Sequence, residues 1–198
     1  MFIKSVTGAI LAGGKSSRMG RDKALLEIDG KPFIQRIAET LRQIFNHVVI
    51  ISDHGENYKF LNLPIYDDVY KNCGPLGGIH SALTHSTTKS VFIVPCDIPF
   101  LSPDVVRSIL FSHGYTAATV PTALGCIQPL CGVYTRRCLP LLEKHLKRGQ
   151  FKVHRFLEGA DAAFVSLPHR TDGEISSLIA NINSVEEFKR WIKGAPIA

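Results

Sequence analysis

The sequence predicts an α/β fold, a Rossmann-like sandwich of three layers in which helices cover both faces of a mostly parallel sheet. Short apolar runs of the kind found in buried strands, at 6–12, 48–51 and 91–96, alternate with longer amphipathic segments. The first half also follows the order strand, helix, strand, and two strands joined through a helix normally pair in parallel. We therefore expect several strands to end at one edge of a sheet, where such folds bind ligands.

The first half contains one well-defined amphipathic helix. Apolar residues recur every three or four positions from Phe33 to Phe45, and Lys31-Pro32 marks the expected helix start. Before it, Asp29-Gly30 is a strong turn signal that closes a short extended piece at 24–28. The other elements expected in this half are an extended piece at 63–66 and a helix at 79–85 that the glycine-rich run 73–78 opens.

The second half is expected to continue the alternation. Ser102 and Pro103 suit the N-cap and the first position of a helix that continues to about Gly114. The other elements expected here are strands at 116–120, 128–134 and 163–167, a loop at 121–125, and helices at 136–147, 151–157 and 185–192.

Length and composition indicate one globular domain over residues 1–198. The chain has 45% hydrophobic and 20% charged side chains, which is enough apolar material for a substantial core. Its apolar runs are far shorter than the roughly 20 residues that span a bilayer, and its N-terminus lacks the pattern of a signal peptide. We expect a cytoplasmic protein with no membrane association.

Cysteine, histidine and charge exclude several classes of function. The five cysteines are odd in number and include no C-x-x-C pair, so we expect reduced thiols and neither a disulfide framework nor a zinc site. The eight histidines include no pair at H-x-x-x-H spacing. The net charge of +6 favours anionic partners, but the basic residues are dispersed. That distribution favours a phosphorylated small molecule over nucleic acid.

The loop after the first strand is the strongest candidate for anion binding. Adjacent glycines, Gly13 and Gly14, allow the backbone to approach a ligand, and their N–H groups can form an anion-binding concavity. Four cations follow closely, namely Lys15, Arg18, Arg21 and Lys23. Nucleotide phosphates are the expected ligand.

Two better-known phosphate loops do not fit this stretch. A Walker A motif ending at Gly14-Lys15-Ser16 needs a further glycine at position 9, where the chain has Ala9 within the predicted strand. The dinucleotide pattern G-x-G-x-x-G is also absent, because the two glycines are adjacent and Gly20 does not open an amphipathic helix.

Three separate segments are expected to meet at the carboxyl edge of the sheet. They are the Gly13-Gly14 loop, the helix start at Gly74 to Gly78, and Asp97, which follows a buried strand. Nucleotidyl transfer needs donors around the triphosphate, a cation beside the α-phosphate and a carboxylate that holds Mg²⁺. Taken alone, Asp97 also fits a turn or cap, and the glycines also fit close packing of helix on sheet.

The opening stretch resembles the signature L-A-G-G-x-S-x-R-M-G-x-D-K of the molybdenum cofactor guanylyltransferases, which residues 11–23 match. The resemblance extends from Thr7 to about Trp191 through further matching segments, at Asp67, 74–78, 95–99, 128–130 and 181–183. It implies a nucleotide-diphospho-sugar transferase-like fold, with a nucleotide half at about 1–100 and an acceptor half at about 101–198.

The resemblance also implies residue roles. Catalysis would depend on Lys23 near the α-phosphate, Arg18 toward the departing phosphates, and Asp97 as the Mg²⁺ ligand. Asp53 stands where the family has an asparagine that reads the guanine edge, and a carboxylate can also accept from guanine N–H groups. Further nucleotide or cofactor contacts are implied for Leu11, Ala12, Gly13, Gly14, Asp67, Gly77, Gly78, Asn181 and Asn183.

The expected reaction is transfer of GMP from GTP to the terminal phosphate of molybdopterin, with or without molybdenum, with release of pyrophosphate. Candidates for acceptor binding are Gln128, Lys147, Arg148 and Arg155. Other cofactor-assembly proteins stay open as partners. The alternatives are a cytidylyltransferase or a sugar-phosphate nucleotidyltransferase of the same fold, or a non-catalytic nucleotide-binding adaptor in cofactor assembly.

Overall fold

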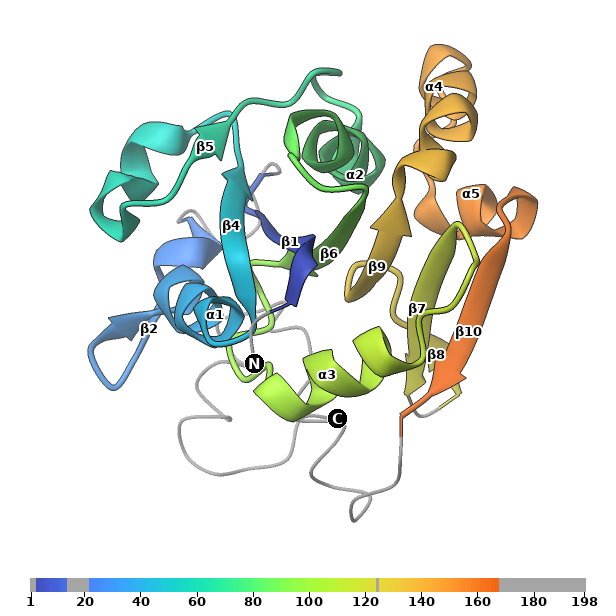
Figure 1. Ribbon diagram of the computed structural model, residues 1–198. Helices are drawn as coiled ribbons and strands as arrows, with labels where there is room; N and C mark the ends of the chain where they lie inside the picture. Colours follow the sequence, from blue (N-terminus) through green and yellow to red (C-terminus); the bar gives the residue numbers. More distant parts are fainter. Residues whose placement is uncertain (1–2, 14–21, 124, 168–198) are drawn as a thin grey trace.

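The computed structural model describes residues 3–13, 22–123 and 125–167, and these form a mixed, mostly parallel sheet covered by helices (Figure 1). The strands of this sheet are β1 (Ile3–Leu11), β4 (Phe45–Ile51), β5 (Ile65–Tyr66), β6 (Ser90–Pro95), β7 (Ala118–Ala123), β8 (Cys126–Ile127), β9 (Gly132–Thr135) and β10 (Ala162–Ser166). The helices are α1 (Phe33–Arg42), α2 (Gly74–His85), α3 (Pro103–Phe111), α4 (Leu139–Lys147) and α5 (Val153–Gly159). Short 3-10 helices are η2 (Lys23–Leu25), η3 (Gly55–Leu61) and η4 (Arg136–Cys138), and a separate hairpin pairs β2 (Glu27–Ile28) with β3 (Lys31–Pro32).

The sheet has the order β10-β7-β9-β6-β1-β4-β5, with β8 paired to β7. Strand β1 lies between β4 and β6 and is parallel to both, and β5 is parallel to β4. Strand β9 is antiparallel to β6 and to β7, which makes the sheet mixed. The predicted fold class, helices on both faces of a mostly parallel sheet, is confirmed, and strands from both halves of the chain share this sheet.

Two apolar cores lie on opposite faces of the sheet. Helices α1 and α3 cover one core, and α2, α4 and α5 cover the other (Figure 1). Alternate residues of β1 point to opposite faces, so Ile10 packs in the first core while Ala9 and Leu11 pack in the second. Burial on both faces explains why β1, β4 and β6 read as continuous apolar runs. No helix within the described ranges has the length and apolarity needed to cross a membrane.

Several local expectations are confirmed. The Ser102 side chain accepts a hydrogen bond from Val105 N–H at 3.3 Å and caps α3, with Pro103 in the first position. Asp29 and Gly30 both have positive φ, 51° and 71°, as a two-residue hairpin turn requires. The free thiols include three buried cysteines, Cys73, Cys131 and Cys138, whereas Cys96 is half-buried and Cys126 is exposed.

Other local expectations are wrong. Of the extended piece expected at 24–28, only residues 27–28 form a strand. Residues 24 and 25 belong to a 3-10 helix, because Asp22 accepts a hydrogen bond from Ala24 N–H and starts a turn there. Residues 121–123 continue β7 instead of forming a loop, since Pro121 lacks a donor but its carbonyl accepts from Gln128 N–H at 2.8 Å. Helix α1 also ends before Phe45, which begins β4. The helix expected at 185–192 lies outside the described residues.

Candidate active site

The parallel strands β1, β4, β5 and β6 end level with one another at one edge of the sheet. Leu11 pairs with both Ile51 and Pro95, and Ile51 pairs with Tyr66. Main-chain hydrogen bonds extend this register past the strands, from Ala12 N–H to Ile51 O at 3.0 Å and from Cys96 N–H to Leu11 O at 3.1 Å. The residues that follow these four strands are therefore brought to the same edge.

Four predicted site residues stand one or two positions after the ends of these strands. Gly13 follows β1, Asp53 follows β4, Asp67 follows β5 and Asp97 follows β6. Gly13 is exposed, and a Cβ placed on it would meet nothing within 4 Å among the described residues. Packing within the described part of the chain therefore does not require glycine at this position, which is consistent with close approach by a ligand.

Asp97 has the environment of a metal ligand. Its Oδ1 is buried, and no group among the described residues donates a hydrogen bond to it. Burial raises the pKa of Asp97, and the charge of Lys23 opposes that increase. A buried carboxylate oxygen without a donor fits a bound divalent cation, which would satisfy it.

Lys23 lies close enough to Asp97 for their charges to interact, although the two are far apart in the sequence. It is half-buried and is the first residue of η2. The preceding residue, Asp22, accepts from Ala24 N–H at 3.0 Å and from the Tyr58 hydroxyl at 2.6 Å. The positive charge of Lys23 is therefore within electrostatic range of Asp97.

Asp53 and Asp67 are joined by Lys71, which no motif in the sequence marks as a site residue. The Lys71 ammonium lies 2.5 Å from Asp53 Oδ1 and 3.0 Å from Asp67 Oδ2. Desolvation raises the pKa of Asp53, but hydrogen bonds from Lys71 and from Asp68 N–H outweigh it, so the pKa is lowered. Residues 67–71 form no helix, so the spacing of four between Asp67 and Lys71 gave no sequence signal for this contact.

Gly77 and Gly78 have packing reasons of their own. A Cβ on Gly77 would lie 3.0 Å from the Tyr70 carbonyl oxygen, and one on Gly78 would lie 3.2 Å from the Leu11 side chain. Leu11 and Ala12 are themselves buried, so only their backbone could face a ligand. Their predicted ligand contacts stay predictions, because packing against residues 70–73 already accounts for Gly77 and packing of α2 on β1 accounts for Gly78.

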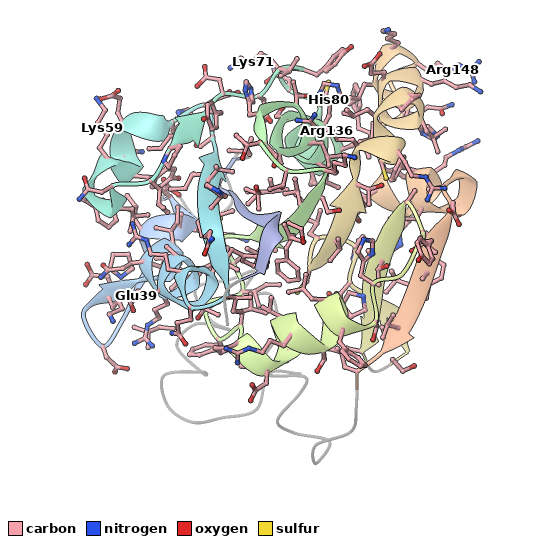
Figure 2. The ribbon with its side chains drawn as sticks, viewed as in Figure 1. Glu39, Lys59, Lys71, His80, Arg136 and Arg148 are labelled. Atoms are coloured by element: carbon pink, nitrogen blue, oxygen red, sulfur yellow. The ribbon has the colours of Figure 1, made fainter. Side chains whose placement is uncertain are left out.

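The remaining predicted residues are not all assembled at this edge. Arg148 is exposed at the end of α4 and lies well apart from Lys71 (Figure 2). Lys147 and Arg155 are also exposed, and Gln128 is half-buried between β8 and β9. Outside the described residues lie Gly14, Arg18, Asn181 and Asn183.

Covalent catalysis by the neighbouring thiol is disfavoured. Burial, with the adjacent Asp97 charge, raises the pKa of Cys96 to about 12, so the thiol stays neutral. Within the described part of the chain, no three His, Cys, Asp or Glu side chains gather as a metal cage. A metal held by Asp97 would therefore depend on phosphate and water oxygens for further ligands, as Mg²⁺ commonly does.

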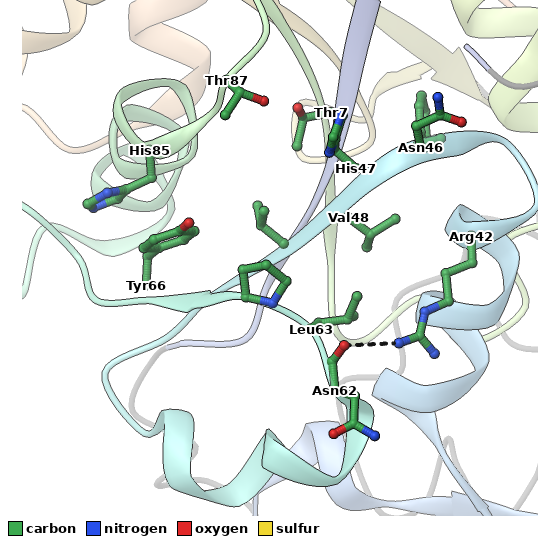
Figure 3. Close-up of a pocket in the computed structure, with 13 residues that line it drawn as sticks. Thr7, Arg42, Asn46, His47, Val48, Asn62, Leu63, Tyr66, His85 and Thr87 are labelled. Carbon is green, nitrogen blue, oxygen red and sulfur yellow. Dashed lines mark hydrogen bonds between the residues drawn. The ribbon is translucent and has the colours of Figure 1, made fainter. Parts of the chain in front are cut away.

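A cavity of about 340 Å³ lies elsewhere, along the edge of β4 that β5 leaves uncovered (Figure 3). Its lining includes Arg42, His47 and His85, and Tyr66 stacks on His85 with ring centroids 4.5 Å apart. Among the described residues, neither a predicted site residue nor a carboxylate lines it. We therefore place the candidate active site at the strand ends.

The chain is a nucleotidyltransferase, because the family model described as MobA-like NTP transferase domain matches residues 8–164. A probable molybdenum cofactor guanylyltransferase of Carboxydothermus hydrogenoformans is 34% identical over 96% of this chain and 97% of its own length. One from Clostridium perfringens is 36% identical over 94% of this chain and 96% of its own. The chain therefore belongs to the molybdenum cofactor guanylyltransferase family.

A solved structure shows the same fold. The molybdopterin-guanine dinucleotide biosynthesis protein A of Archaeoglobus fulgidus superimposes with a TM-score of 0.81 at 23% identity, over 94% of this chain and 97% of that one. The predicted family and enzyme class are confirmed by the family model and by the two relatives above. The assignment of roles to individual residues stays a prediction.

Proposed function

We propose that this protein transfers GMP from GTP to the terminal phosphate of molybdopterin and releases pyrophosphate. The observation that supports it best is the placement of Lys23 within electrostatic range of Asp97, whose Oδ1 is buried without a donor among the described residues, in a chain of this family. In this proposal the residues up to about 100 hold the nucleotide, and those from about 101 hold the acceptor.

Asp97 is the residue proposed to hold Mg²⁺. When bound, Mg²⁺ neutralises charge on the phosphates during the transfer. Lys23 adds a fixed positive charge at the same place, and Arg18 is proposed to act on the departing pyrophosphate. The attacking phosphate is already ionised near neutral pH, so no side chain is needed as a general base.

Asp53 is proposed to select guanine. Its Oδ1 is held by Lys71 and by Asp68 N–H, and among the described residues no donor is seen for Oδ2. With Oδ1 held, Oδ2 can accept from guanine N1–H or N2–H. Adenine, cytosine and uracil lack this arrangement of donors. Asp67, which pairs with the same Lys71, is proposed to contact the nucleotide as well.

The proposal is tested by measuring pyrophosphate release with GTP, ATP, CTP and UTP, each with and without molybdopterin and Mg²⁺. We expect release only with GTP, and only when molybdopterin is present. A preference for CTP would instead indicate a cytidylyltransferase. Release that requires a sugar phosphate would indicate a sugar-phosphate nucleotidyltransferase, and GTP binding without turnover would indicate an adaptor.

Replacing Lys71 tests the contact with the base. In Lys71→Met, Asp53 and Asp67 lose their shared counter-ion, and their charges then repel the triphosphate. We expect KM for GTP to rise about threefold, because exposed ion pairs are weak and screened. Lys59→Met is the control, since Lys59 pairs with Glu56 on η3, away from Lys71 (Figure 2), and loses the same charge. An equal rise in both variants would contradict a local role.

A further inference from the structure

The position of Lys23 is fixed through the residues on both sides of it. On one side, Ala24 is fully buried in the core beneath α1. On the other, Asp22 uses both carboxylate oxygens, Oδ1 for Ala24 N–H and Oδ2 for the Tyr58 hydroxyl. A main-chain hydrogen bond also links the two sides of Lys23, from Leu25 N–H to Asp22 O at 3.0 Å.

The contact from Tyr58 is the only one of these that comes from a distant part of the chain. Tyr58 belongs to η3, which follows β4, and its side chain is 1% exposed. Its hydroxyl donates to Asp22 Oδ2 at 2.6 Å, within the range of charge-assisted bonds. Burial and the bond to Asp22 raise the pKa of Tyr58 well above its ordinary value, so the hydroxyl stays a donor throughout the neutral range.

We propose that Tyr58 is a positioning residue for nucleotidyl transfer, which holds Lys23 beside Asp97 through Asp22. The inference rests on the proposed function, because Lys23 is assigned there to the phosphates. Tyr58 does not touch the substrate in this account. Its hydroxyl fixes the carboxylate that starts η2, and η2 fixes the backbone from which the Lys23 side chain extends.

A displaced Lys23 is expected to affect the chemical step more than GTP binding. The ammonium stabilises charge that develops during the transfer, and small displacements of such a group lower the rate steeply. In Tyr58→Phe the ring still fills the core, so we expect kcat to fall about tenfold with KM for GTP little changed. A purely structural role would lower the melting temperature and leave kcat of the folded protein as it is.

Two further variants separate these possibilities. Thr7→Val is the matched control, because Thr7 is also buried and its hydroxyl bonds Ser86 and Thr88 at 2.9 Å, away from the strand ends. It should lose stability and keep the wild-type kcat.

Asp22→Asn removes the charge that Tyr58 contacts. If Tyr58 acts through Asp22, the double variant of Tyr58→Phe and Asp22→Asn should be no slower than the slower single variant. Independent, multiplicative losses would overturn the pathway through Asp22.

A spectroscopic measurement tests the proposal without turnover. Lysines are reductively methylated with ¹³C-formaldehyde, and the Lys23 signal is assigned by its absence in Lys23→Arg. We expect Tyr58→Phe to shift this signal toward those of exposed lysines, and Thr7→Val to leave it in place. An unmoved Lys23 signal would overturn the proposal. If the wild-type protein instead failed to transfer GMP while this signal moved, the proposed function would fail and the positioning of Lys23 would stand.

Discussion

Asp97→Asn should lower kcat by about 10³-fold and leave GTP binding in the absence of Mg²⁺ largely unchanged. The side chain keeps its size, so packing at the end of β6 is preserved. The amide has no negative charge, however, and it presents a weaker oxygen ligand to a cation. The measurements are steady-state kinetics with Mg²⁺ and calorimetric titration of GTP with and without Mg²⁺.

The control for this variant is Asp104→Asn, which makes the same change in charge on α3. Asp104 is exposed and forms only an exposed ion pair with Arg107, at 3.3 Å. The turnover of the Asp104→Asn variant should therefore match that of the wild type. Two results would count against the metal assignment. One is near-normal turnover of Asp97→Asn, and the other is an equal loss of GTP affinity with and without Mg²⁺.

The location of the site could be predicted because it follows from strand order. Each of the runs before Gly13, Asp53 and Asp97 is mostly apolar, and such runs indicate parallel strands buried on both faces. Parallel strands joined by helices must end at a common edge, so the residues after them converge without any knowledge of side-chain contacts. In the structure, Leu11 pairs with both Ile51 and Pro95, so these three strands do end at a common edge.

The contacts that hold these residues could not be predicted in the same way. The link from Tyr58 to Asp22 joins two short 3-10 helices, and no periodicity in the sequence indicates such a pair. Lys71 reads as an ordinary exposed lysine until β4 and β5 place Asp53 and Asp67 on either side of it. The glycines of α2 are visible in the sequence, but the sequence cannot distinguish a glycine needed for close packing from one needed for close approach of a ligand.

Lys23→Gln should lower kcat by about 10²-fold, because it removes a fixed charge that interacts with Asp97 at the site of transfer. Its effect on folding should be small, since the side chain is only half-buried and η2 depends on Asp22 and Ala24.

Lys23→Arg provides the matched comparison, because it keeps the charge and changes the reach and shape of the donor. We expect it to recover part of the lost rate, whereas Lys59→Gln, on the exposed face of η3, should lose none. Equal losses in the Arg and Gln variants would mean that the reach and shape of the ammonium matter and that charge alone does not restore the rate. Full activity in Lys23→Gln would remove Lys23 from the mechanism, and Asp97 would then act without a cation from η2.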